Sequence, residues 1–198
     1  MKCFSRLKNS ADIIKKDLYW QGAFDWPGYG CREIPNVEGV YLWTFPYKKG
    51  YVLYCAGVTK SMKDRFKFHT RQYKRGKYTV LDIDEALNGE RKEIWHGWKY
   101  AKMHQDEFIA KKDSILKAVD NQLKAFRIFI IEEKDPRLRY RIEAAIMHNI
   151  YMSKESYTEL ADRGMNLISR YNYEIPIVIN TLCDFKIYSI KKTMEIYP

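Results

Sequence analysis

The chain has 198 residues, of which 46% are hydrophobic and 30% are charged, a balance typical of a globular protein and not of a disordered one. Its net charge of +10 favours a polyanionic partner. We find no apolar run near the roughly 18 residues that a membrane span needs, and no signal peptide, so we expect a cytoplasmic protein without a membrane partner.

The four cysteines do not form a metal-binding or disulfide pattern. Cys3, Cys31, Cys55 and Cys183 are scattered and include no C-x-x-C pair. We therefore expect no structural zinc and interpret Cys55 as a small buried strand residue.

Residues 1–38 are predicted to be an N-terminal extension. A helix is expected from Ser10 to Trp20, with Ser10 or Asp12 as its cap, followed by a loop rich in glycine and proline. Aromatic residues such as Trp20 and Trp26 could pack on the core or contact DNA, and packing is the favoured interpretation.

A β-hairpin is predicted next. Residues 39–45 and 51–59 are rich in β-branched and aromatic residues, and a loop containing Gly50 separates the two runs. The two runs are expected to supply two neighbouring strands of the central sheet.

The hairpin is followed by a basic helix. Thr59 or Ser61 could cap its start, and Arg65 precedes His69 by four residues, so the two side chains can reach one target. Residues 60–77 contain eight basic side chains and one acidic one, which favours a phosphate-facing surface. Its apolar stripe consists of Met62, Phe66, His69 and Tyr73. The residues expected to bind nucleic acid are Lys60, Lys63, Lys67, Arg71, Lys74, Arg75 and Lys77.

The second half of the chain alternates between helices and strands. A helix is predicted from about Gln105 to Leu123, and the next helix begins at Asp135-Pro136, with the aspartate as its cap. The other predicted elements are an extended piece at 78–83, helical turns at 84–87 and 156–161, a loop at 89–100, a buried third strand at 126–131, and tail strands at 175–179 and 185–190.

Several of these residues occur in the order and spacing of a known family. Gly39-Val40-Tyr41, then Gly57-x-Thr59, Arg65 six residues later and His69 four after that, resemble the GIY-YIG nuclease family. The family's metal-binding glutamate would be Glu143, on the helix after the third strand, and its downstream asparagine would be Asn166.

The second motif departs from the family pattern. Cys55 and Ala56 precede Gly57 where the family has tyrosine and isoleucine, and Tyr54 lies one position too early. Because strand side chains alternate between faces, Tyr54 would point away from the site unless a β-bulge restores its direction. Either the bulge is present or the second tyrosine is missing.

The resemblance implies an α/β (α+β) fold with a small antiparallel or mixed three-stranded sheet flanked by helices. It spans a nuclease domain over residues 39–170, with a C-terminal extension, 171–198, packing on it. The implied activity is metal-dependent endonucleolytic hydrolysis of DNA, with one Mg²⁺ or Mn²⁺ on Glu143. The implied roles place Arg65 on the phosphate, His69 in proton transfer and Tyr41 on the attacking water. The remaining candidates are Tyr54 and Asn166 in the site, and Tyr78 as a supporting hydroxyl.

Two alternatives remain open. The chain could be a catalytically impaired nucleic-acid-binding module of the same fold, since its second motif is altered. An active enzyme could serve repair, homing or restriction, and the sequence does not separate these roles.

Overall fold

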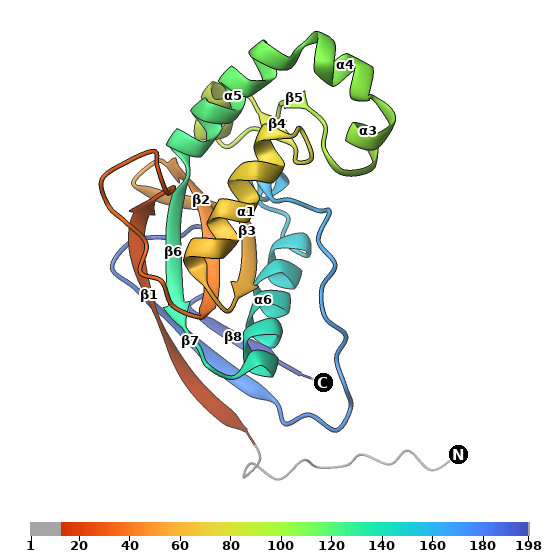
Figure 1. Cartoon of the computed structure of the whole chain (residues 1–198). Coiled ribbons are helices and arrows are strands. Elements are labelled where there is room, and N and C mark those ends of the chain that lie inside the picture. Colours follow the sequence, from red (N-terminus) through yellow and green to blue (C-terminus); the bar gives the residue numbers. More distant parts are fainter. Residues whose placement is uncertain (1–12, 198) are drawn as a thin grey trace.

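The computed structural model describes residues 13–197 and has a mixed six-stranded sheet with strand order β3-β2-β6-β1-β7-β8 (Figure 1). Strands β1 and β7 pair in parallel, and the other neighbours are antiparallel. The predicted sheet of three strands is therefore too small. The three predicted strands are β2, β3 and β6, and β1, β7 and β8 add three more to the same sheet. The strands span Ile14–Asp25 (β1), Gly39–Tyr47 (β2), Gly50–Thr59 (β3), Arg127–Glu132 (β6), Ile177–Cys183 (β7) and Thr193–Ile196 (β8).

Strand β1 replaces the helix that the sequence predicted at the N-terminus. Leu18 and Trp20 are buried whereas Tyr19 between them is 68% exposed, the two-residue period of a strand. The first half of β1 pairs with β7 and the second half with β6, so the strand lies inside the sheet. The proposed caps, Ser10 and Asp12, lie outside the described residues.

The helices mostly follow the predicted pattern. Ser61 accepts a hydrogen bond from the Asp64 amide at the start of α1, and Asp135 accepts two at the start of α6, as expected for N-caps. The predicted helix at 105–123 is interrupted at Lys111. The helices are α1 (Met62–Lys74), α2 (Ile83–Leu87), α3 (Trp98–Met103), α4 (Gln105–Ala110), α5 (Lys112–Ala125) and α6 (Pro136–Tyr151), with a 3₁₀ helix at Ser156–Leu160.

Two further predicted segments differ from the structure. Residues 89–100, expected to be a loop, contain β5 (Glu93–Trp95), which pairs with β4 (Val80–Leu81), and the start of α3. Residues 184–192 connect β7 to β8, so the last strand lies at 193–196 and not at the predicted 185–190.

Side chains from the sheet enter two hydrophobic clusters. Along β2, Tyr41, Trp43 and Phe45 join a cluster with α1 and α5, whereas Val40 and Leu42 join one with α6, β7 and β8. Strand β2 is thus buried on both faces. Its side chains point alternately into the two clusters, so a shift of one residue in its pairing would put each side chain in the wrong cluster.

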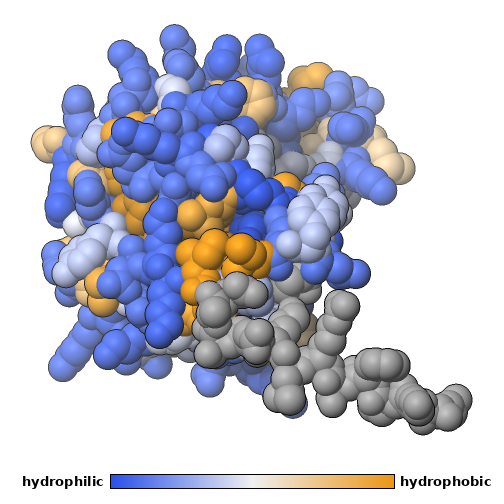
Figure 2. All heavy atoms as spheres, turned by 90° about the horizontal axis from the view of Figure 1, so that it is seen from below, coloured by the Kyte–Doolittle hydropathy of each residue, from blue (hydrophilic) through white to orange (hydrophobic). Residues whose placement is uncertain are grey.

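The surface seen from below is mostly hydrophilic, with hydrophobic residues gathered in one patch (Figure 2). Within residues 13–197, no helix combines the length and the hydropathy needed to cross a membrane.

Trp26 joins the N-terminal segment to the aromatic cluster, and the predicted packing role is confirmed. It is 1% exposed, its ring lies 5.0 Å from those of Trp43 and Phe66, and its Nε1 donates to Thr70 Oγ1 at 2.9 Å. The segment before β2 therefore contributes to the core.

Trp26→Ala should lower the free energy of unfolding by about 3–5 kcal/mol, because it leaves a large cavity among rings that cannot collapse into it. Urea denaturation measures this loss. Tyr173→Ala, at a side chain that is 81% exposed, is the control and should change stability by less than about 0.5 kcal/mol. A similar small effect for Trp26→Ala would show that the segment is not part of the core.

Candidate active site

The structure brings all of the predicted catalytic residues to one cavity of about 310 Å³. Its walls come from β2, β3, α1, α6 and the segment after the 3₁₀ helix, which are distant in the sequence. The predicted residues that line it are Tyr41, Tyr54, Arg65, His69, Glu143 and Asn166, together with Tyr78.

A chain of hydrogen bonds crosses the cavity floor. Arg65 Nε donates to the Tyr41 hydroxyl at 3.1 Å, and that hydroxyl lies 3.0 Å from His69 Nε2. On the other side of the imidazole, His69 Nδ1 lies 3.0 Å from the Tyr78 hydroxyl. Arg65 and His69 occupy adjacent turns of α1, so the predicted convergence of the two side chains is confirmed.

Burial determines the charge state of this chain. His69 is 4% exposed, and burial, with the positive charge of Arg65, lowers its pKa well below the usual value, so the ring is neutral at pH 7. An unperturbed imidazole has a pKa of about 6.5. The Tyr41 oxygen accepts from Arg65 and its proton can still be donated to Nε2; in the His69 tautomer that accepts it, Nδ1 carries the ring proton and donates to Tyr78. Burial also raises the pKa of Tyr41, although Arg65 opposes the rise.

The β-bulge expected in the second motif is present. Trp43 pairs with Cys55 and Thr44 with Leu53, so Tyr54 is the extra residue of β3. As a result Tyr54 and Cys55, adjacent in the chain, both line the cavity, whereas Leu53 belongs to the other hydrophobic cluster. The Tyr54 hydroxyl lies near that of Tyr73, and burial raises the pKa of both phenols well above the usual value.

Gly57 makes room for the central phenol. A Cβ at this position would lie 2.2 Å from both Cζ and the hydroxyl oxygen of Tyr41. Any side chain there would displace the hydroxyl that Arg65 and His69 bind, so the G-x-T glycine has a steric role in this chain.

Cys55 behaves as the buried strand residue that the sequence indicated. Its thiol donates to the Ala56 carbonyl at 3.1 Å, and burial raises its pKa well above the usual value. A neutral, hydrogen-bonded thiol is a poor nucleophile.

Glu143 provides the carboxylate of the cavity. It is 7% exposed, and burial raises its pKa to about 7, with Arg65 opposing the rise. Its oxygens and the side-chain amide oxygen of Asn166 are hard donors of the kind that Mg²⁺ takes, and a cavity of this size has room for the waters that Mg²⁺ keeps. No cluster of three or more His, Cys, Asp or Glu residues suited to a metal occurs within residues 13–197. Mg²⁺ commonly uses only one or two carboxylates, so the donor set fits it.

The sequence did not point to three further residues of the cavity wall, Trp98, Tyr140 and Asp162. Asp162 is 8% exposed, and burial raises its pKa, while a hydrogen bond from the Gly164 amide and the positive charge of Arg91 oppose the rise. An aspartate two residues before a glycine is typical of a turn and carries no spacing signal for a site.

The residues predicted to bind nucleic acid lie outside the cavity, on or next to α1. All are exposed except Lys77, which is half-buried, and no ion pair with another described residue neutralises them. Arg65 and His69 face inward from the same helix, so one helix carries both the cavity residues and a basic outer surface.

Comparisons with protein-family models, with curated proteins and with solved structures found no match. The functional interpretation of the cavity therefore depends on the chemistry of its own residues.

Glu143→Gln should stabilise the metal-free protein at pH 8 by roughly 2–3 kcal/mol. With a folded pKa of about 7 against 4.5 in the unfolded chain, the folded state keeps a proton that the unfolded state loses, so this group's contribution to stability falls as pH rises from 4.5 through 7. Urea denaturation in EDTA at pH 5 and pH 8 measures the effect. Equal stability of the two proteins at both pH values would contradict the assigned burial.

Proposed function

We propose that the protein is a metal-dependent endonuclease that hydrolyses phosphodiester bonds in DNA. The observation that carries the proposal is that residues far apart in the sequence meet at one cavity, with Tyr41 hydrogen-bonded to both Arg65 and His69. Unrelated surface residues would not be expected to meet in this way.

The charges of the cavity suit a phosphodiester. Arg65 is a permanent cation without an ion-pair partner among residues 13–197, whereas His69 is neutral. A phosphate oxygen is a natural partner for this guanidinium, which can donate from its terminal nitrogens while Nε stays bonded to Tyr41. The exposed lysines and arginines of α1 would hold the flanking backbone.

Each residue has a role in the reaction. Arg65 neutralises the phosphate and orients it, and the Tyr41 oxygen positions the attacking water and accepts its proton. As it does so, Tyr41 passes its own proton to His69 Nε2, whose basicity rises when the phosphate anion lies nearby. Glu143 and Asn166 would hold the divalent cation, which supplies Lewis-acid stabilisation of the negative charge on the phosphate and leaving oxygens.

The alternative, a binding module without catalysis, was raised by the altered second motif. The bulge weakens that argument because Tyr54 lines the cavity despite its displaced position in the sequence. The two functions predict different outcomes in one assay.

The test is cleavage of supercoiled plasmid by wild type and Glu143→Ala with Mg²⁺, Mn²⁺ or EDTA. We expect metal-dependent nicking by wild type and its loss in the variant, while salt-sensitive DNA binding persists in both. Binding without cleavage by wild type would favour the binding module. Equal cleavage by both proteins would remove Glu143 from the reaction or reveal a contaminating nuclease.

Arg65→Lys should lower the cleavage rate by about 100-fold, because lysine keeps the charge but loses the planar donor fork and the bond to Tyr41. Single-turnover cleavage measures the rate. Arg170→Lys, at an exposed arginine outside the cavity, is the matched control and should leave it unchanged. An unaltered rate in Arg65→Lys would show that Arg65 does not contact the reacting phosphate.

Tyr54→Phe should lower the rate by about tenfold or more, whereas Cys55→Ala should have little effect, because only the tyrosine places a hydroxyl at the cavity. Thermal unfolding of both variants controls for folding, as both side chains are buried. Equal rates in Tyr54→Phe and wild type would show that the bulge places a ring and not a reactive hydroxyl in the site.

A further inference from the structure

A second cavity adjoins the candidate active site. Its volume is about 660 Å³, and Trp98, Asp162, Gly164 and Asn166 line both cavities. We call it the Trp98 cavity. Away from the shared wall it is rich in basic side chains: Arg91, Lys99, Lys102 and Arg163.

Trp98 stands at the boundary between the two cavities in an unusual backbone conformation. Its φ of 58° lies in the left-handed region, which bulky residues rarely adopt and which costs free energy unless surrounding contacts maintain it. Such strained residues cluster at binding sites, so the strain at Trp98 is consistent with a ligand contact made by its indole.

Three neighbours fix the indole. The Tyr78 ring lies 5.2 Å away, and the indole lies near enough to the Asp162 carboxyl to oppose the rise of its pKa. Gly164 leaves the necessary space, since a Cβ there would lie 2.9 Å from Trp98 Nε1. The ring is nevertheless 40% exposed, so an oriented aromatic surface remains open to a ligand.

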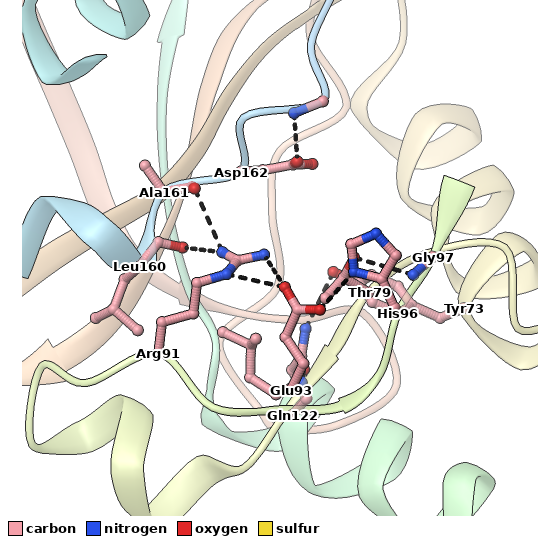
Figure 3. Close-up of polar contacts among 12 residues, drawn as sticks. Tyr73, Thr79, Arg91, Glu93, His96, Gly97, Gln122, Leu160, Ala161 and Asp162 are labelled. Atoms are coloured by element: carbon pink, nitrogen blue, oxygen red, sulfur yellow. Dashed lines mark hydrogen bonds and ion pairs between the residues drawn. The ribbon is translucent and has the colours of Figure 1, made fainter. Parts of the chain in front are cut away.

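The wall behind the Trp98 cavity is held by a polar network (Figure 3). Arg91 donates to the carbonyls of Leu160 and Ala161 at 2.9 and 3.3 Å and pairs with Glu93, which also contacts His96. These bonds tie the segment before α3 to the segment that carries Asp162. Arg91 is thus engaged in the wall.

Lys99 and Lys102 are differently placed. Both are exposed, and neither makes an ion pair with another residue of the described chain. Their charges remain available to an anionic ligand that enters the cavity from the candidate active site.

We propose that the Trp98 cavity binds an unpaired nucleotide next to the scissile phosphate, with its base stacked on Trp98 and its backbone near Lys99 and Lys102. This inference rests on the proposed nuclease function and names its substrate class: DNA with a bulge or single-stranded flap at the cut. Bases inside a duplex already stack on their neighbours, so only an unpaired base can offer a free face to the indole.

The test measures binding without cleavage, using fluorescence anisotropy in EDTA. The probes are three fluorescein-labelled DNAs of matched sequence: a paired duplex, the duplex with a one-nucleotide bulge, and the duplex with a single-stranded flap. Trp98→Gly removes the ring and suits the left-handed backbone, so this variant should fold, which thermal unfolding verifies. Trp98→Phe keeps an aromatic face.

We expect wild type to prefer the bulged or flapped DNA, and Trp98→Gly to weaken that binding by about tenfold while leaving the paired duplex unchanged. Trp98→Phe should retain most of the preference. Lys102→Ala should weaken binding of the unpaired forms more than Lys117→Ala, a control of equal charge change at an exposed lysine of α5 outside both cavities.

Three outcomes would overturn the inference: equal binding of all three DNAs by wild type, an equal loss for paired and unpaired DNA in Trp98→Gly, or no loss at all. Because the assay needs no cleavage, Trp98-dependent binding by a protein that cuts neither plasmid nor the bulged and flapped DNAs with Mg²⁺ or Mn²⁺ would reject the nuclease and retain the unpaired-strand site. Cleavage by a protein whose DNA binding does not depend on Trp98 would reject the unpaired-strand site and retain the nuclease.

Discussion

The phenol of Tyr41 is the contact on which the candidate site depends. Its oxygen accepts from Arg65 and lies within hydrogen-bond distance of His69, while its ring stacks on Trp43 at 5.8 Å and meets Phe66 at 5.3 Å. The hairpin and α1 are therefore joined by the same residue that would touch the attacking water. A change that moves the hairpin or α1 also moves the Tyr41 hydroxyl. Substitutions in this part of the core are therefore expected to affect the proposed catalysis as well.

Burial gives the cavity its electrostatic character. It keeps His69 neutral and holds the Glu143 carboxyl near its midpoint at pH 7, while Arg65 stays charged. The Arg65 guanidinium has no ion-pair partner within residues 13–197, and the carboxyl beside it has a raised pKa. Such a cavity is suited to an anion and a cation that arrive together, since each stabilises the other in a region of low dielectric.

Local signals in the sequence predicted the hairpin, β6, α6 and α1, with Thr59 or Ser61 as the cap of α1, and Ser61 is the cap. Family spacing predicted that Tyr41, Arg65, His69 and Glu143 would meet. Strand β1 was missed because its parallel partner, β7, lies more than 150 residues away, and no local pattern encodes that pairing. The position of Trp98 at the Trp98 cavity was missed for a similar reason. Its conformation arises from contacts with Tyr78, Asp162 and Gly164, which only the folded chain brings together.

Titration of Mn²⁺ followed by electron paramagnetic resonance tests the central claim most directly, because it observes the proposed ligand without relying on turnover. The account predicts one Mn²⁺ per wild-type chain at pH 8, competition by Mg²⁺, tighter binding when a phosphorothioate DNA that resists cleavage is present, and loss of the site in Glu143→Gln. Equal Mn²⁺ binding by both proteins, or none by wild type with DNA present, would contradict it.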